Sequence, residues 1–142
     1  MDEKIQNLKI MGITKRFPGV LACDAIDLEV GENQVFALVG ENGAGKTTLM
    51  NMLMGLYQPD EGEIRINDRK VQFHTPAEAF AAGIGMVHQH FMLVPNMTVA
   101  ENVALGAREF HSLGRLDLGG AKKRIKDISA RYNLPVQPES YI

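Results

Sequence analysis

This sequence has little of what marks a secreted, membrane-spanning or nucleic-acid-binding protein. It holds a single cysteine, Cys23, so it forms no internal disulfide, and a reducing compartment is the default. No stretch approaches the ~20 apolar residues of a membrane span, and the polar first residues predict no signal peptide. The net charge of −2 argues against a nucleic-acid-binding surface. We therefore expect a soluble, cytoplasmic protein with no nucleic-acid partner.

One stretch organises the rest of the chain, whose 142 residues are 45% hydrophobic and fit one domain with a buried core. The apolar run Val35–Val39 predicts a short strand buried on both faces, as in a parallel sheet. A glycine-rich loop follows this run directly. The loop consists of Gly40, Glu41, Asn42, Gly43, Ala44, Gly45, Lys46, Thr47 and Thr48.

The loop fits the pattern of a phosphate-binding loop, which is a glycine, four further residues and then Gly-Lys-Thr. Glycines let the backbone curl and point successive N–H groups at one anion. Lys46 would add a positive charge for the β- and γ-phosphates, and the Thr47 hydroxyl suits Mg²⁺. Residues 48–54 predict a helix whose N-terminus would also face the phosphates. The alternative is a turn that happens to contain several glycines.

Alternation of apolar and polar residues predicts antiparallel strands on either side of the loop. Residues 8–12 and 25–30 predict two strands, with a turn at 15–20 between them. After the helix, residues 63–66 and 70–73 flank an Asn-Asp-Arg turn and predict a hairpin.

Helix-start signals are clear in the second half of the chain. Residues 75–78 predict a capping box with proline at the first helical position, and Gly83 would end that helix. Residues 84–88 predict another buried strand. A second capping box at 98–101 opens a helix to about residue 105, and residues 121–132 predict an amphipathic helix.

Three segments resemble motifs of one family. The loop, with Asn42-Gly43-Ala44 at its centre, looks like the Walker A segment of ATP-binding cassette (ABC) transporter ATPases. Residues 83–103 are similar to the Q-loop region of this family, above all in importers of simple sugars and nucleosides, and residues 14–20 resemble its A-loop. The match runs from about Leu8 to Gly106. No Asn/Thr-Lys-x-Asp motif for guanine follows the loop, so a GTPase has little support.

The resemblance implies an α/β fold, a P-loop NTPase (RecA-like) core with an antiparallel β subdomain. Residues 1–75 would hold the antiparallel strands with the P-loop strand and helix. Residues 76–106 would hold a helix, the Q-loop strand and the following helix, and residues 107–142 the start of the helical subdomain. The sequence lacks a Leu-Ser-Gly-Gly-Gln-like signature and a Walker B strand. We therefore expect residues 1–142 to be the N-terminal part of an ABC ATP-binding domain, truncated before those segments.

The resemblance also implies roles for single residues. Gly40–Thr48 would bind ATP, and Thr47 and Gln89 would hold Mg²⁺. Gln89 and Lys46 would be the catalytic residues, with the Gln89 side-chain oxygen orienting the water near the γ-phosphate. Phe17 would stack on adenine. The alternatives are an ordinary packed aromatic for Phe17 and a polar strand-end residue for Gln89.

Partners follow from the same resemblance. The apolar run Met92–Pro95 would help to form the groove for a transmembrane permease subunit. A second ATP-binding cassette would complete the ATP site, and a solute-binding protein would act indirectly. The implied function is the ATP-binding subunit of an importer of simple sugars or nucleosides, peripheral on the inner face of the cell membrane. A non-transport ABC-type ATPase and a P-loop phosphotransferase remain as alternatives.

The absent segments lead to two further expectations. The catalytic Glu and the signature are missing, so we expect the chain alone to show no ATP turnover. In this family the strands between Val35–Val39 and Ile84–His88 come later in the chain, so we expect both runs to have unpaired edges and exposed apolar faces. The spacing of His88 and His90 suggests a metal site only weakly, because no cysteine or third histidine is near in sequence.

Overall fold

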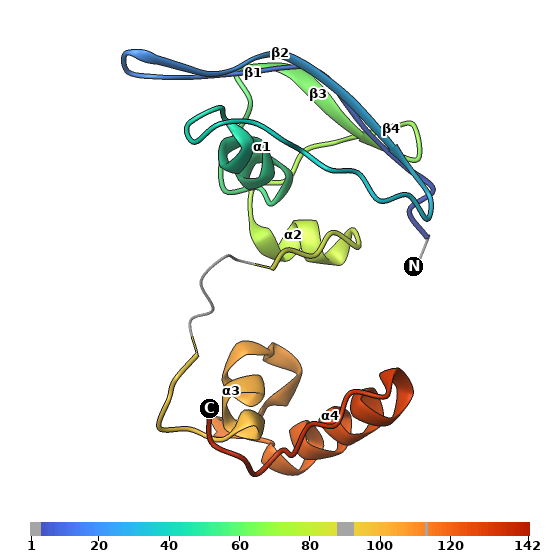
Figure 1. The fold of residues 1–142 in the computed structure, drawn as a ribbon, viewed down its shortest axis with the longest axis vertical. Helices are drawn as coiled ribbons and strands as arrows, with labels where there is room; N and C mark the ends of the chain where they lie inside the picture. Colours follow the sequence, from blue (N-terminus) through green and yellow to red (C-terminus); the bar gives the residue numbers. More distant parts are fainter. Residues whose placement is uncertain (1–3, 88–92, 113) are drawn as a thin grey trace. The chain divides into compact units, whose positions relative to one another are not determined.

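The computed structural model describes residues 4–87, 93–112 and 114–142. The chain divides into two compact units, residues 1–87 and residues 88–142. Figure 1 shows a curved sheet with two helices in the first unit, and helices α3 and α4 in the second. Among the residues that the structure describes, none of the helices has the length and apolar content to cross a membrane.

The first unit is built on an antiparallel sheet of four strands in the order β2-β1-β3-β4. The central hairpin is longer than predicted, because residues 15–17, expected in a turn, continue the first strand and pair with residues 20–23. The turn itself holds only Pro18 and Gly19. The two strands predicted at 8–12 and 25–30 and the hairpin predicted at 63–73 are confirmed. The strands are β1 (Asn7–Phe17), β2 (Val20–Gly31), β3 (Glu61–Ile66) and β4 (Arg69–Val71).

An irregularity in β1 brings two isoleucines to the same core. The pairing with β2 shifts between Ile10 and Ile13, where Gly12 has a left-handed φ of 59° and its N–H donates to the Asp27 carboxylate (2.8 Å). A regular strand would turn residues three apart to opposite faces. With the shift, Ile10 and Ile13 are 1% and 0% exposed.

The turn between β3 and β4 is tighter than predicted. Asn67 and Asp68 both have positive φ, 50° and 60°, as a two-residue type I′ turn requires, and Arg69 already belongs to β4. The Asn67 side chain accepts from the Gln6 N–H (2.7 Å) and donates to the Lys4 carbonyl (3.1 Å). The turn therefore also holds the start of the chain against the sheet.

Helix α1 (Lys46–Leu53) covers one face of the sheet and confirms the helix predicted at 48–54, with a start two residues earlier. Its buried residues are Leu49, Met52 and Leu53. They pack against residues of three strands, namely Ile10, Ile13, Cys23 and Ile64.

Helix α2 (Pro76–Ala81) has Thr75 as its N-cap and a proline in its first turn, as predicted, but its capping box is incomplete. The Thr75 hydroxyl accepts from the Glu78 N–H (3.3 Å), whereas the Glu78 carboxylate accepts from the His74 N–H (2.8 Å). The reciprocal bond to Thr75 is thus replaced by one to the preceding residue. Gly83 follows the helix with φ 90°, which confirms the predicted end.

Two predicted strands are not strands in the structure. Residues 34–40 and 84–87 are assigned no secondary structure, and His88 lies outside the described residues. Val35 and Val39 are 101% and 88% exposed, and Val87 is 78% exposed. The predicted burial of 35–39 is therefore wrong, because a strand needs hydrogen-bonded neighbours and no described strand lies beside it. The exposed apolar side chains match the expectation for unpaired runs.

The second unit contains α3 (Val99–Gly106), η1 (Arg108–Phe110), β5 (His111–Ser112), β6 (Arg115–Leu116) and α4 (Leu118–Tyr132). Its predicted capping box is confirmed: the Thr98 hydroxyl accepts from the Glu101 N–H (3.3 Å), and the Glu101 carboxylate accepts from the Thr98 N–H (2.7 Å). A small core of Ala104, Phe110 and Ala121 joins α3, η1 and α4.

Helix α4 begins three residues before the predicted start, because Asp117 caps it by accepting from the Gly120 N–H (2.9 Å). The last residues, for which no element was predicted, return to the start of α3. There the Val99 and Ala100 N–H groups donate to the carbonyls of Ser140 and Pro138 (both 2.9 Å).

Candidate functional site

The glycine-rich loop joins the unpaired segment at 35–39 to α1. Gly43 and Gly45 have left-handed φ values of 88° and 84°, and the Ala44 N–H donates to the Glu41 carbonyl (3.2 Å). These glycines let the backbone turn back on itself. Gly45 is also the N-cap of α1, and no side chain caps this helix. Its first N–H groups are therefore available to an anion.

Strand β2 fixes the end of this loop by direct contact. A Cβ on Gly45 would lie 2.0 Å from the Ala22 carbonyl oxygen and 3.3 Å from the Cys23 Sγ. Cys23 is buried, and burial raises the pKa of its thiol, so it is a neutral packing group there. A Cβ on Gly43 would meet nothing within 4 Å. Position 45 thus requires glycine for close approach as well as for φ, and position 43 for φ alone.

Lys46 is the first residue of α1, and its side chain bends back over the loop. Its Nζ donates to the carbonyls of Gly40 (2.6 Å) and Glu41 (2.7 Å). Both acceptors are neutral backbone groups, so neither bond is an ion pair. This places the predicted lysine and the start of the predicted loop in direct contact.

The hydroxyl residues of the loop lie in the first turn of α1. Thr47 is exposed, and Thr48 is half-buried. A threonine hydroxyl next to Lys46 is a hard oxygen donor of the kind that Mg²⁺ prefers, so the residues present fit a magnesium-bound phosphate. The exposed residues of the loop are Gly40, Glu41, Asn42, Gly43, Ala44 and Thr47.

Phe17 is the last residue of β1. It lies near the part of β2 that contacts Gly45, because Lys15, two residues before Phe17, pairs with Cys23. Its ring lies edge to face with that of Tyr57, with centroids 5.4 Å apart and planes at 75°. The Lys15 Nζ lies 5.6 Å from the Phe17 centroid. The Phe17 ring thus contacts the side chains of Tyr57 and Lys15, and the sequence indicated neither contact.

Several predicted residues lie outside the described part of the chain. These are Gln89, the two histidines at 88 and 90, and Met92, so their roles stay predictions. Of the apolar run 92–95, Leu93 and Val94 are 47% and 39% exposed. In the described ranges, no group of three or more His, Cys, Asp or Glu is placed to hold a metal ion.

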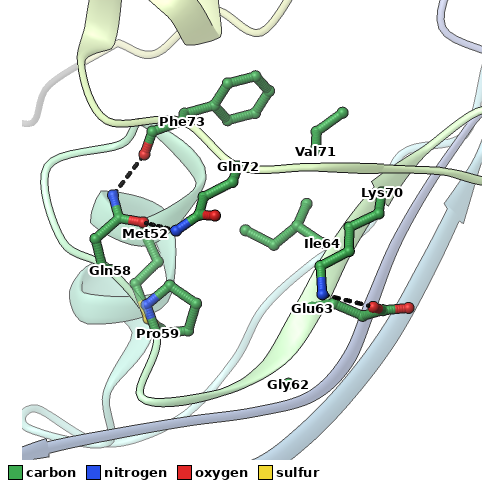
Figure 2. Close-up of a pocket in the computed structure, with 10 residues that line it drawn as sticks. All are labelled: Met52, Gln58, Pro59, Gly62, Glu63, Ile64, Lys70, Val71, Gln72 and Phe73. Carbon is green, nitrogen blue, oxygen red and sulfur yellow. Dashed lines mark hydrogen bonds and ion pairs between the residues drawn. The ribbon is translucent and has the colours of Figure 1, made fainter.

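A pocket of about 180 Å³ lies between α1 and the β3–β4 hairpin. Figure 2 shows that its polar groups bind one another: the Gln58 Nε2 donates to the Phe73 carbonyl (2.5 Å), and the Gln72 Nε2 donates to the Gln58 Oε1 (3.1 Å). Lys70 pairs with Glu63 at 3.1 Å. None of its lining residues belongs to the predicted site, so the glycine loop, which is an open surface turn, remains the candidate.

Sequence reasoning missed the residues that hold the loop and Phe17 in place. Ala22 contacts Gly45 through its backbone carbonyl, a group that every residue carries, so no side-chain signal could have indicated it. Tyr57 follows α1 in a turn, where an aromatic has no periodic pattern. Both contacts depend on the path of the chain rather than on local sequence.

The loop with its two left-handed glycines, the lysine bent over it and the uncapped helix behind it have the form of a phosphate-binding loop. A family model described as "ABC transporter" matches residues 23–142. The chain belongs to the ABC transporter family. The matched residues include the whole loop and the second unit, and the family predicted from the sequence is confirmed.

Curated relatives point to import systems. The chain is 52% identical over 133 residues to the guanosine import ATP-binding protein NupO of Bacillus subtilis, covering 94% of this chain and 26% of the relative. It is 46% identical over 135 residues to the nucleoside import ATP-binding protein NupA of Lactococcus lactis, covering 95% and 26%. It is 56% identical over 102 residues to the glucose import ATP-binding protein TsgD13 of Haloferax volcanii, covering 72% and 18%. The chain thus spans about a quarter or less of the length of these relatives.

Solved structures agree on the fold. A nucleotide-free ATP-binding cassette from an ABC transporter matches with a TM-score of 0.64 at 31% identity, over 79% of this chain and 43% of that one. The ADP conformation of another ABC transporter cassette matches with a TM-score of 0.67 at 27% identity, over 96% and 49%. The predicted fold class, an α/β ABC ATPase fold with an antiparallel β subdomain, is confirmed.

Proposed function

We propose that this chain binds MgATP through Gly40–Thr48 and is the nucleotide-binding part of an ATPase that drives import of simple sugars or nucleosides. The observation that carries the proposal is the loop itself, where the Lys46 Nζ donates to the Gly40 and Glu41 carbonyls and the helix that follows has no side-chain cap. The names of the import relatives support the transport role.

In this proposal the loop residues divide the work on the phosphates. N–H groups of the loop and of the first turn of α1 bind phosphate oxygens. The Lys46 Nζ exchanges its two carbonyl partners for β- and γ-phosphate oxygens, which are stronger acceptors because they are charged. No large movement is required, since the lysine already lies over the loop.

The remaining residues are assigned to Mg²⁺, to the attacking water and to the adenine of ATP. Thr47 and Gln89 would hold Mg²⁺, which neutralises charge on the phosphates when bound. Gln89 and Lys46 would act in catalysis, with Gln89 orienting the attacking water. Phe17 would stack on adenine, a contact worth ~1–3 kcal/mol. That the chain alone does not turn over ATP stays a prediction.

The partners proposed are those of an import system. The run Met92–Pro95 would contact a transmembrane permease subunit, a second cassette would complete the ATP site, and a solute-binding protein would act through the permease. The protein would lie peripherally on the inner face of the membrane. The proposed organisation within the ATP-binding domain is 1–75 for the antiparallel strands with the P-loop strand and helix, 76–106 for a helix, the Q-loop strand and the following helix, and 107–142 for the start of the helical subdomain.

Lys46→Ala tests the phosphate assignment. Hydrogen bonds to charged groups contribute ~1.5–3 kcal/mol, so we expect ATP affinity to fall roughly tenfold to a hundredfold. Titration of a fluorescent ATP analogue with Mg²⁺ measures this. The matched control is Lys123→Ala, which removes the same charge from an exposed position of α4 and should leave affinity unchanged. Equal affinities for the Lys46→Ala and unaltered chains would contradict the proposal.

A further inference from the structure

The Phe17–Tyr57 pair is an aromatic contact that the proposed phosphate site does not use. The two rings meet edge to face at 5.4 Å, a favoured aromatic geometry. Tyr57 is 40% exposed, and Phe17 is half-buried. Phe17 stands at the last position of β1. The contact with Tyr57 therefore restrains the Phe17 ring from the side of the connection that follows α1.

The backbone of Tyr57 is anchored to the end of α1. The N–H groups of Leu56 and Tyr57 both donate to the Asn51 carbonyl (2.9 and 3.3 Å). Gly55 precedes them with φ 71°, and a Cβ there would lie 2.9 Å from that of Phe73. These contacts fix the path of the backbone after α1 and so fix the position of the Tyr57 backbone.

Asp60 ties the other end of this connection to β1. Its N–H donates to the Thr14 carbonyl (2.9 Å), and its carboxylate accepts from the Lys15 Nζ (2.8 Å) and the Arg16 N–H (2.6 Å). These bonds hold the pKa of the Asp60 carboxyl below its usual range. Lys15 is at the same time the cation beside the Phe17 ring. Tyr57 is therefore held between two anchors, one on α1 and one on the strand that carries Phe17.

We propose that Tyr57 is a positioning residue for the base of the bound nucleotide, acting through the Phe17 ring. Tyr57 packs against Phe17 and keeps the ring turned so that its remaining surface meets the base. Helix α1 carries Lys46 at its start and leads directly into the Tyr57 turn, so one rigid element sets both the phosphate and the base contacts. This inference rests on the proposed function, because it takes Phe17 as the base contact.

The test compares ATP with inorganic triphosphate, which has the same phosphates and no base. Tyr57→Leu removes the aromatic edge, so we expect ATP affinity to fall about three- to tenfold, the size of one aromatic pair. Triphosphate affinity should not change. Tyr57→Phe keeps the ring and should bind ATP as the unaltered chain does. Tyr132→Leu is the matched control, since Tyr132 is an exposed tyrosine of α4 in the other unit.

A double variant shows whether Tyr57 acts through Phe17. If it does, Phe17→Ala with Tyr57→Leu should lose no more ATP affinity than Phe17→Ala alone, because contacting residues are not additive. A larger loss in the double variant would mean that Tyr57 contributes independently and would overturn the positioning role.

The outcomes separate the two proposals. If the unaltered chain binds neither ATP nor triphosphate, the proposed function fails and this inference fails with it. If Lys46→Ala weakens ATP but Tyr57→Leu does not, the proposed function stands and the role of Tyr57 is overturned. An equal loss for ATP and triphosphate in Tyr57→Leu also overturns it, because that pattern indicates a general disturbance of the loop.

Discussion

Two apolar segments of the first unit have opposite environments. Ile10 and Ile13 of β1 are 1% and 0% exposed, whereas Val35 and Val39 are 101% and 88% exposed. Strand β1 has a hydrogen-bonded neighbour on each side and α1 packed on its core face. The run at 35–39 has no described strand beside it. An apolar run thus indicates a tendency to be buried, and a covering surface decides whether it is.

The largest expected effect tests this contrast directly. Ile13→Ala leaves a cavity in the core and should lower the free energy of unfolding by ~2–5 kcal/mol. Val35→Ala should change it by less than about 0.5 kcal/mol, since an exposed side chain loses no packing. Urea denaturation followed by circular dichroism measures both. A comparable loss for Val35→Ala would show that this valine is covered in solution.

A second test contrasts two glycines of one loop that share a left-handed φ but not their surroundings. Either change to alanine should cost about 1–2 kcal/mol for the conformation. Gly45→Ala also drives a Cβ toward the Ala22 carbonyl, 2.0 Å away before any movement. Gly45→Ala should therefore lower the free energy of unfolding, measured by heat or urea, by at least about 1 kcal/mol more than Gly43→Ala does. Equal losses would mean that β2 does not hold the loop.

The smallest effect on stability is expected at the capping box of α3, where Glu101 accepts two hydrogen bonds from Thr98. The Glu101 carboxylate accepts from the Thr98 N–H and hydroxyl (both 2.7 Å), and these bonds hold its pKa below the usual value. A lowered folded pKa stabilises the fold above the unfolded value, about 4.3, and this contribution is lost as pH falls through the folded pKa. Glu101→Gln should therefore flatten the acid side of the stability profile below about pH 4.3. An acid titration of unfolding that overlays that of the unaltered chain would contradict this.

Features that depend on residues near in sequence, such as helix caps and helix ends, were predicted well. The caps at Thr75 and Thr98 and the end at Gly83 need only neighbours a few residues away. The errors have different causes. Burial of 35–39 depended on strands elsewhere, whereas the capping box at Thr75 differs because the Glu78 carboxylate accepts from the nearby His74 N–H.

The candidate site also has features that the sequence determines and features that only the tertiary structure determines. Sequence by itself determined the loop, its lysine and hydroxyl residues and the family to which they belong, because a phosphate site of this kind is one continuous stretch of backbone and its residue types follow from that shape. Tertiary structure alone decided that Ala22 holds Gly45 and that Tyr57 meets Phe17. Those contacts join segments far apart in the chain, and a side chain or carbonyl finds such a partner only when the sheet and α1 have brought the segments together.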